Sequence, residues 1–333
     1  MTKALALFSG GLDSMLATRL VMEQGVEVTA LNFISPFFGV GKKGREDEAA
    51  ADFFRKYGIK SLVIDISDEY VEMIRNPRYG YGKNFNPCID CKIFMMKKAK
   101  AIMQEEGYDF IVSGEVLGQR PMSQRRDALR IIERDSGLDY YLLRPLCAKL
   151  LKPTYPEEHG LIDREKLMDI SGRARRRQME LAEHFGISDY ETPAGGCLLT
   201  DPIISVRIEK LLKQNKEVEP EDVRLLAVGR HFTLPGGMLY VGRNIEDNRR
   251  ISELVRAGDF TLKAMDTPGP LVLYSGTPGS GNLELAARIT ARYSDAKGRD
   301  MVKVCIRAKD GVEEVVDVKP LDNVGLEPMR TIY

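Results

Sequence analysis

The chain of 333 residues carries 49 Lys and Arg against 49 Asp and Glu, so its formal net charge at pH 7 is zero. A hydrophobic content of 43% is typical of a globular protein with a sizeable core, and the length predicts about two domains. No stretch is long and apolar enough to span a bilayer, and we expect no signal peptide. The cysteines, five in number, are sparse and odd, which favours reduced thiols and a cytoplasmic location.

Strands and helices alternate over the first half of the sequence. Apolar runs predict strands at residues 4–8, 27–33, 60–66, 108–112 and 142–146. Helices are predicted between and after them, at residues 13–24, 44–57, 87–106 and 164–186. This alternation predicts an α/β domain with a parallel sheet, whose ligands bind at the carboxyl ends of the strands.

The pattern changes near residues 200–202 and becomes richer in strands. We predict helices at 203–214 and 283–293, strands at 238–241, 259–266 and 269–276, and a hairpin at 302–318 that turns at Asp310-Gly311. The second half is therefore predicted to be a smaller α+β domain. We place the two domains at residues 1–203 and 204–333.

The segment that joins the first strand to the first helix reads SGGLDS. Gly10 and Gly11 allow successive N–H groups to converge on an anion, and the helix start adds the positive end of its dipole. Ser9 and Ser14 add hydroxyl donors. The lysine that holds the β- and γ-phosphates in γ-phosphoryl transfer is absent, so we predict a loop that holds pyrophosphate as a leaving group. A plain strand–turn–helix junction capped by Asp13 or a serine is the alternative.

SGGLDS in this position resembles the PP-loop, or N-type ATP pyrophosphatase, superfamily. The resemblance implies an adenine nucleotide alpha hydrolase-like fold for the first domain. It also implies that ATP and Mg²⁺ adenylate an oxygen, that pyrophosphate leaves, and that a nucleophile then displaces AMP. By this resemblance Ser9, Gly10, Gly11, Asp13 and Ser14 bind ATP, and Asp13 orients the metal or the pyrophosphate.

Three cysteines are candidates for chemistry. Cys88 and Cys91 follow an Asn-Pro turn at a predicted helix start, which favours thiolates, and Cys197 follows Gly195-Gly196. Such a set suits three irons of a four-iron cluster with one iron open, or a pair that carries a persulfide. Ordinary buried thiols are the alternative. Two further cysteines are expected in the core, Cys147 and Cys305.

NPCIDC followed by GGC is similar to the tRNA thiouridine synthases, which are tRNA sulfurtransferases. The resemblance implies that Asp13, Cys88, Cys91 and Cys197 are catalytic. In one branch the three cysteines hold a 4Fe-4S cluster, and in the other a cysteine carries a persulfide. IVSGEVLGQ and LRPL are similar to two further family motifs near the nucleotide. They imply that ATP or the substrate lies near these residues: Gly114, Gln119, Arg120 and Arg144.

Arginines cluster in two segments, SGRARRRQ and GQRPMSQRRDALR. Since phosphate contacts supply most of the affinity for RNA, a neutral protein that binds RNA must concentrate its positive charge. We expect RNA contacts from the first cluster, which comprises Arg173, Arg175, Arg176 and Arg177. A solvated charged face is the alternative.

A further motif, VGRN with a later Asn, resembles the RNA-binding domain of the NFACT family. The matching positions are Tyr240, Arg243, Asn244 and Asn248, and the resemblance implies that Arg243 and Asn244 contact RNA. A dimerisation or packing module is the alternative for this domain.

These observations predict a cytoplasmic ATP-dependent tRNA sulfurtransferase that adenylates a uridine and inserts sulfur. The expected partners are tRNA and a sulfur donor, either sulfide or a persulfide carrier protein; no membrane is expected, and a homodimer is left open. One alternative is a PP-loop ligase or amidotransferase for a small metabolite, which leaves the three cysteines unexplained. The other is a non-catalytic protein that binds nucleotide and RNA.

Overall fold

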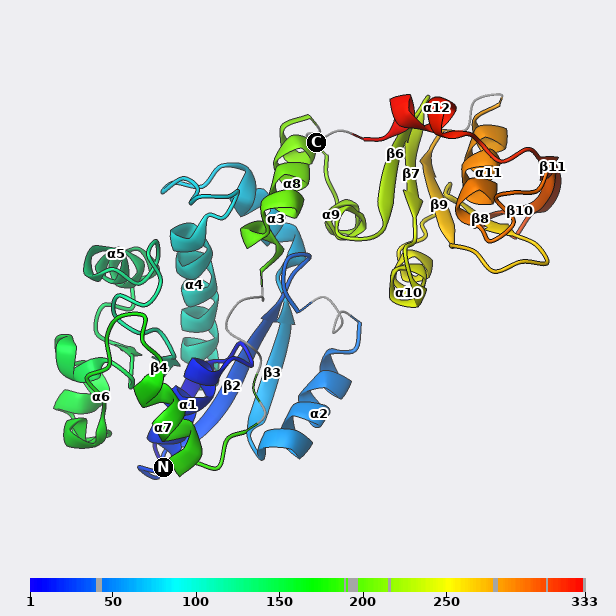
Figure 1. Cartoon of the computed structure of the whole chain (residues 1–333). Helices are drawn as coiled ribbons and strands as arrows, with labels where there is room; N and C mark the ends of the chain where they lie inside the picture. The colour runs from blue at the N-terminus through cyan, green and yellow to red at the C-terminus, as the bar shows by residue number, and fades with distance from the viewer. Residues whose placement is uncertain are drawn as a thin grey trace. The chain divides into compact units, whose positions relative to one another are not determined.

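The computed structural model describes residues 1–39, 44–188, 190, 197–214, 217–277, 281–309 and 311–331. The chain divides into two compact units, Met1–Ser205 and Val206–Tyr333, whose elements are labelled in Figure 1. The predicted domain boundary, after residue 203, lies within helix α8 (Pro202–Gln214). No helix in the described part of the chain is long and apolar enough to cross a membrane.

The first unit is built on a parallel sheet of five strands in the order β3-β2-β1-β4-β5. The strands are β1 (Lys3–Leu7), β2 (Glu27–Ile34), β3 (Lys60–Asp65), β4 (Phe110–Ser113) and β5 (Leu142–Leu143). The chain runs from β1 outward to β3, then returns to the other side of β1 for β4 and β5. The carboxyl ends of β1 and β4 therefore form the topological switch point, where sheets of this kind bind ligands.

Helices flank this sheet and confirm the predicted α/β class. They are α1 (Leu12–Met22), α2 (Glu46–Tyr57), α3 (Ser67–Arg75), α4 (Cys88–Glu106), α5 (Arg126–Ser136), α6 (Tyr155–Glu158) and α7 (Arg176–His184). Helices α3 and α5 were missed by the sequence analysis. The short apolar runs in both are interrupted by charged residues.

The predicted helix over residues 164–186 is wrong in its first half. Only a single 3-10 turn forms at Arg164–Lys166, and α7 begins later, at Arg176. Between them the backbone is bonded to other segments: Met168 N–H donates to Pro145 O and Ile170 N–H donates to Leu146 O, each at 2.9 Å. These backbone groups are consequently not available to a helix.

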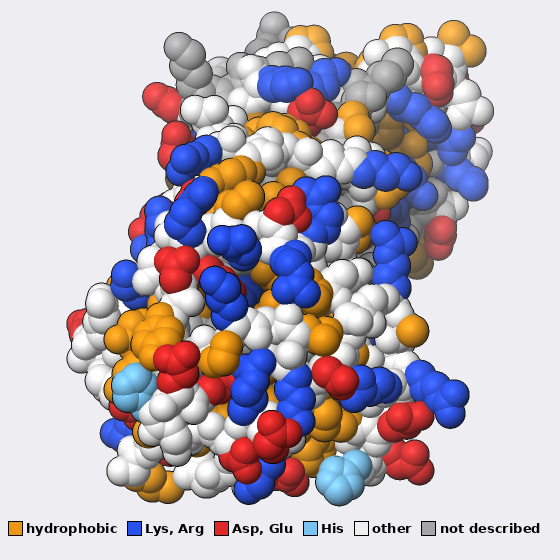
Figure 2. Space-filling model, turned by 90° about the vertical axis from the view of Figure 1, so that its left-hand side faces the viewer, with side chains coloured by type: hydrophobic (Ala, Val, Ile, Leu, Met, Phe, Trp, Pro, Cys, Tyr) orange, Lys and Arg blue, Asp and Glu red, His pale blue; other side chains and the backbone are white. Residues whose placement is uncertain are grey.

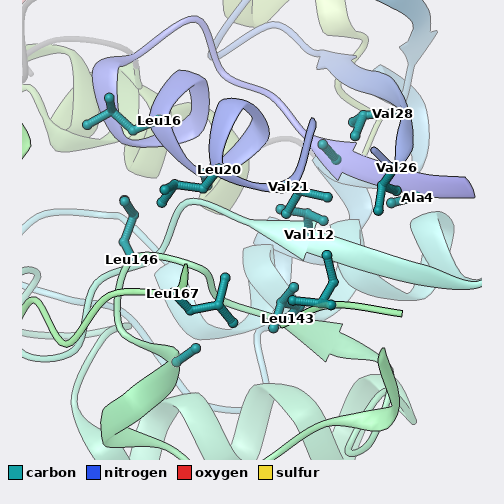
Figure 3. Close-up of a cluster of buried hydrophobic side chains, with 14 of the residues drawn as sticks. Ala4, Leu16, Leu20, Val21, Val26, Val28, Val112, Leu143, Leu146 and Leu167 are labelled. Carbon is teal, nitrogen blue, oxygen red and sulfur yellow. The ribbon is translucent and has the colours of Figure 1, made fainter. Parts of the chain in front are cut away.

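Apolar side chains beneath α1 hold the first unit together. Figure 3 shows Leu16, Leu20 and Val21 of α1 pointing toward Val112 of β4 and Leu143 of β5. The side chains of β1 alternate, so Leu5 points to the opposite face, and it is fully buried there. Helix α4 contacts β1 and β4. The sheet is thus buried on both faces, as expected for parallel strands.

The second unit is a six-stranded antiparallel sheet in the order β11-β10-β8-β9-β7-β6, with helix α11 (Asn282–Tyr293) packed on it. Its strands are β6 (Arg230–Leu234), β7 (Gly237–Val241), β8 (Phe260–Ala264), β9 (Val272–Gly276), β10 (Val302–Ala308) and β11 (Glu313–Val318). The other helices are α9 (Pro220–Leu226), α10 (Ile245–Glu253) and α12 (Asn323–Leu326). The predicted α+β class and the β10–β11 hairpin are confirmed. Asp310, at the predicted turn, lies outside the described residues.

Candidate active site

The loop between β1 and α1 leaves the start of a helix open to a ligand. Gly10 has φ +82°, a conformation that other residues rarely adopt. Gly11 is the N-cap of α1 and, being a glycine, brings no side chain to cover the first N–H groups. The Ser14 hydroxyl donates to Gly11 O at 2.7 Å, and Ser9 Oγ lies 3.5 Å from Ser14 Oγ. Open N–H groups at the positive end of a helix favour an anion.

A second loop, which follows β4, packs directly on the first. A Cβ on Gly114 would lie 2.6 Å from both the carbonyl carbon and the carbonyl oxygen of Asp13, so only glycine fits. The amide of Gln119 donates to Asp13 Oδ2 at 2.7 Å, and Gln178 of α7 donates to Gln119 Oε1 at 3.0 Å. Gly114 and Gln119 therefore both lie against the SGGLDS loop, and their predicted place near ATP or the substrate stays a prediction.

Buried polar atoms around Asp13 have hydrogen-bonding capacity left over. Arg175 Nη2 lies 3.6 Å from Asp13 Oδ1. Among the described residues no hydrogen-bond partner is found for Asp13 Oδ1, Arg175 Nε or Gln178 Oε1. Since buried polar groups are nearly always satisfied, these atoms fit a polar ligand with donors, acceptors or a hydrated cation. The residues present thus fit a nucleotide with Mg²⁺.

Arg144, expected beside ATP, is a buried cation. Its side chain is fully buried, its Nε donates to Glu115 Oε2 at 3.0 Å, and it also pairs with Glu133. Burial acts to raise the pKa of Glu115, but the charges of Lys92 and Arg144 hold that pKa below its usual value. Two carboxylates match the charge of Arg144, whereas no hydrogen-bond partner is found for its Nη2 among the described residues. Its predicted place near ATP stays a prediction.

Cys88 and Cys91 occupy the first turn of α4, as the sequence predicted. Cys88 Sγ accepts a hydrogen bond from Asn86 Nδ2 at 3.1 Å. Cys91 Sγ accepts one from the Tyr70 hydroxyl at 2.8 Å. Cys197 lies within electrostatic reach of both thiols. All three are free cysteines. Their action as one group stays a prediction.

Burial raises the pKa of two of these thiols. It raises the pKa of Cys91 to about 11, although the Tyr70 hydrogen bond and the Lys92 charge act to lower that pKa. Burial, and then the charge of Cys91, raise the pKa of Cys197 to about 12. The expectation that the helix start favours a thiolate is therefore wrong for Cys91, because desolvation outweighs the helix dipole. A bound cationic centre would reverse this preference.

In the described ranges no three His, Cys, Asp or Glu side chains converge closely enough to hold a single metal ion. A lone zinc draws its ligands to about 2.0–2.3 Å, whereas the cysteines of an iron–sulfur cluster bind separate irons. The described residues therefore do not match a lone zinc site.

The two remaining cysteines differ from each other. Cys147 is fully buried, with its Sγ 3.4 Å from Glu115 O, as expected for a core residue. Cys305 of β10 is only partly buried, so its assignment to the core is wrong. Gly195 and Gly196, expected to bring Cys197 close, lie outside the described residues.

The arginines of the first cluster have separate environments at and before the start of α7. Arg175 faces Asp13. Arg176 pairs with Glu180 at 2.9 Å, Arg177 pairs with Asp169 at 2.7 Å, and Arg173 is exposed. Figure 2 shows one face of the molecule, on which Lys and Arg side chains are numerous but interspersed with Asp and Glu. Charge is thus mixed on this face, and only short clusters are strongly basic.

The polar residues of the VGRN motif and the later Asn make hydrogen bonds within the second unit. Asn244 is the N-cap of α10 and accepts from Asp247 N–H at 2.8 Å. Asn248 Oδ1 accepts from Leu271 N–H at 2.9 Å, and Tyr240 is buried. Arg243 donates to Asp247 at 2.6 Å, yet about half of its side chain is exposed. Of these four, Arg243 is the one with charge available to a phosphate.

Sequence reasoning missed three residues that shape the site. Tyr70 and Asn86 each donate to a candidate sulfur, and Gln178 completes the chain of amides that ends at Asp13. The pattern Tyr70-Val71 followed by Ile74 would have predicted the buried face of α3. Nothing local to the sequence pairs Tyr70 with Cys91.

Comparison with known families agrees with both predicted resemblances. Residues 1–150 match the family described as "Thiamine biosynthesis protein (ThiI)". Residues 229–327 match the family described as "NFACT protein RNA binding domain". Both resemblances are confirmed over these segments.

Individual relatives are described as tRNA sulfurtransferases. The chain is 31% identical over 172 residues to a "Probable tRNA sulfurtransferase" of Thermococcus kodakarensis, covering 51% of this chain and 40% of that protein. It is 26% identical over 230 residues to a "tRNA sulfurtransferase" of Desulfurococcus amylolyticus, covering 67% and 41%. A solved "4-thiouridine synthetase - RNA complex with bound ATP" has 18% identity and a TM-score of 0.37, covering 68% and 52%. The chain spans between 30% and 52% of the length of the curated relatives it matches.

Replacing Gly114 by alanine is expected to weaken ATP binding by roughly tenfold, because the new methyl group must push the Asp13 backbone and distort the anion loop. Isothermal titration with ATP measures the effect. Gly298→Ala is the matched control, since a Cβ there meets nothing within 4 Å. Equal ATP affinity in the two variants would contradict the close packing of the two loops.

Replacing Arg144 by leucine is expected to lower the free energy of unfolding by about 3–5 kcal/mol, because Glu115 and Glu133 lose their buried counter-charge. Urea denaturation followed by circular dichroism measures the loss. Arg176→Leu removes an exposed ion pair and should cost less than about 1 kcal/mol. A similar loss in both variants would show that Arg144 does not carry the buried network.

Proposed function

We propose that this protein is an ATP-dependent tRNA sulfurtransferase that adenylates a uridine and replaces its oxygen with sulfur. One observation carries the proposal: the loop after β4 has contacts toward both the anion loop and a partly buried thiol. The side chain of Gln119 in that loop donates to Asp13. Met122 of the same loop has its Sδ 4.0 Å from Asn86 Nδ2, which also donates to Cys88 Sγ. Activation and sulfur transfer need such adjacency, because the activated carbon must meet the sulfur before water does.

Activation is assigned to the SGGLDS loop. ATP binds with its pyrophosphate against the open N–H groups at the start of α1, and the uridine oxygen attacks the α-phosphate. The growing negative charge on the leaving pyrophosphate is stabilised by dipoles that are already in place. Asp13, held by Gln119, orients Mg²⁺ or the pyrophosphate. The loop has no lysine, which accords with attack at the α-phosphate rather than transfer of the γ-phosphoryl group.

Sulfur delivery is assigned to Cys88, Cys91 and Cys197. These residues would hold either a 4Fe-4S cluster or a persulfide, and a cluster with three cysteine ligands supplies an open iron for incoming sulfide. The sulfur comes from sulfide or from a persulfide carrier protein. Their partial burial keeps water from the reacting sulfur. In the sulfide route, sulfide would attack the activated carbon and AMP would leave. In the persulfide route, the outer sulfur supplied by a carrier protein would attack and AMP would leave. A second thiol of the three would then break the remaining S–S bond and end in a disulfide with the first.

The tRNA is assigned to cationic side chains of both units. Arg175 faces Asp13 of the anion loop. The cationic side chains assigned to tRNA adjoin Arg175 in sequence: Arg173, Arg176 and Arg177. The second unit adds a segment similar to an RNA-binding domain and the half-exposed Arg243. A target uridine in a loop is extruded into such a site at a cost of a few kcal/mol. A ligase that uses ammonia would leave the trio of thiols without a role.

Serine substitution at Cys88, Cys91 or Cys197 is expected to remove at least one thiolated nucleoside from tRNA, because each variant lacks a sulfur ligand or nucleophile. Variants are expressed in cells that lack the native protein, and tRNA digests are measured by mass spectrometry. Cys305→Ser is the control and should retain thiolation, since Cys305 lies in the second unit. Unchanged thiolation in cells lacking the protein would contradict the function.

Iron and sulfide analysis after anaerobic purification separates the two sulfur sources, because a protein without iron refutes the cluster.

The double variant Arg173→Glu/Arg176→Glu is expected to weaken tRNA binding at least tenfold, because two exposed cations that attract phosphate become anions that repel it. Filter binding at several salt concentrations measures affinity, and the slope of log affinity against log salt should become shallower by about 1 for each phosphate that is no longer neutralised. Arg55→Glu on α2 makes the same kind of change at another exposed arginine and serves as control. Equal affinities in the two proteins would refute the assignment of tRNA to this cluster.

A further inference from the structure

Tyr70 is a fully buried tyrosine whose ring is held by three phenylalanines. Its ring centroid lies 5.6 Å from that of Phe37, 5.3 Å from that of Phe38 and 5.9 Å from that of Phe94. Phe37 and Phe38 follow β2, whereas Phe94 belongs to α4. Contacts from two separate segments fix the ring, so the direction of its hydroxyl is set by packing.

The hydroxyl of this fixed ring points at a candidate sulfur. It donates to Cys91 Sγ at 2.8 Å. A phenol hydroxyl is the stronger donor of the two groups, so the hydroxyl donates and the sulfur accepts.

The same aromatic group also anchors the third cysteine. The N–H of Leu198, the residue after Cys197, donates to Phe37 O at 3.0 Å. Phe37 is itself packed on the Tyr70 ring. Tyr70 thus contacts Cys91 directly. It also packs on Phe37, whose carbonyl accepts from the residue that follows Cys197. Tyr70 is therefore connected to the segments that carry two of the three sulfurs.

We propose that Tyr70 is a positioning residue for sulfur transfer, which holds Cys91 Sγ in place and stabilises negative charge on it through the hydroxyl. The inference rests on the proposed function and adds a residue to it. A hydrogen bond to a charged sulfur is stronger than one to a neutral thiol, and more so away from water. For a bound cluster, such bonds to the ligand sulfurs tune the potential. For a persulfide, the same bond stabilises the thiolate form.

The other charged groups near Cys91 do not replace this contact. Lys92 acts to lower the pKa of Cys91 through its charge, but its Nζ lies 3.9 Å from Glu115 Oε1, which shares that charge. Asp90 accepts hydrogen bonds from the backbone of Arg78 and Tyr79, and its charge opposes a thiolate at Cys91. Tyr70 is therefore the neutral donor that favours a charged sulfur without adding a charge.

The variant Tyr70→Phe tests the inference, because it removes the hydroxyl and keeps the ring. Tyr81→Phe is the matched control, since the Tyr81 hydroxyl donates to Ile74 O at 2.7 Å, a backbone oxygen. The first readout is the alkylation rate of Cys91 by iodoacetamide in reduced, cluster-free full-length protein, followed by mass spectrometry at a fixed pH. We expect a roughly tenfold slower rate in Tyr70→Phe and an unchanged rate in Tyr81→Phe. An unchanged rate in Tyr70→Phe would overturn the inference.

A second readout separates this inference from the proposed function. Pyrophosphate release and thiolated nucleoside are measured in the same single-turnover reaction with tRNA. We expect Tyr70→Phe to release pyrophosphate at the normal rate and to form thiolated product at least fivefold more slowly. Equal slowing of both steps would indicate a merely structural role and overturn the inference. If the unmodified protein forms no thiolated product, the proposed function fails, while the alkylation result still decides the role of Tyr70.

Discussion

The arrangement of the first unit depends on one close approach, that of Gly114 to the backbone of Asp13. Two loops leave neighbouring parallel strands at the switch point of the sheet, and here they touch without room for a methyl group. The close approach has consequences in two directions. Glu115 turns inward to Arg144 and Lys92, whereas Gln119 turns outward to Asp13. A single segment of chain thereby contacts both the anion loop and the buried charges around Arg144.

Burial of charge explains why that segment is rigid. A buried arginine is tolerated only where carboxylates match it, and Arg144 has two of them. Lys92 connects this buried group to the first turn of α4, because it follows Cys91 in sequence and its amine approaches Glu115. Desolvation raises the pKa of the Cys91 and Cys197 thiols. Strongly shifted pKa values of this kind are common in active sites.

Short sequence motifs correctly predicted those parts of the structure whose geometry depends on adjacent residues. SGGLDS combines a buried strand, two glycines and a helix start, so its geometry follows from adjacent residues. CxxC at a helix start likewise places Cys88 and Cys91 on one turn. Nothing in the sequence near Cys197 determines its position relative to Cys88 and Cys91. Its prediction came from the Gly195-Gly196 setting and from the resemblance. The burial of Arg144 was not predicted, because a buried arginine and a solvated one look the same in sequence. The failed first half of the helix at 164–186 has the same origin, since its backbone is bonded to residues near Pro145.

The VGRN motif of the second unit illustrates how a resemblance can be right while its residues have another task. Asn244 begins α10, and Asn248 returns from that helix to bond Leu271. A Cβ on Gly242 would lie 2.1 Å from Asn248 Oδ1, so the glycine is required by the asparagine. The motif therefore specifies the turn between β7 and α10. This structural role explains why the motif identifies the domain. The RNA contact proposed for this unit would then depend on side chains that the turn leaves exposed. Arg243 meets that condition, because in the described part of the chain its half-exposed guanidinium is paired with one carboxylate, that of Asp247.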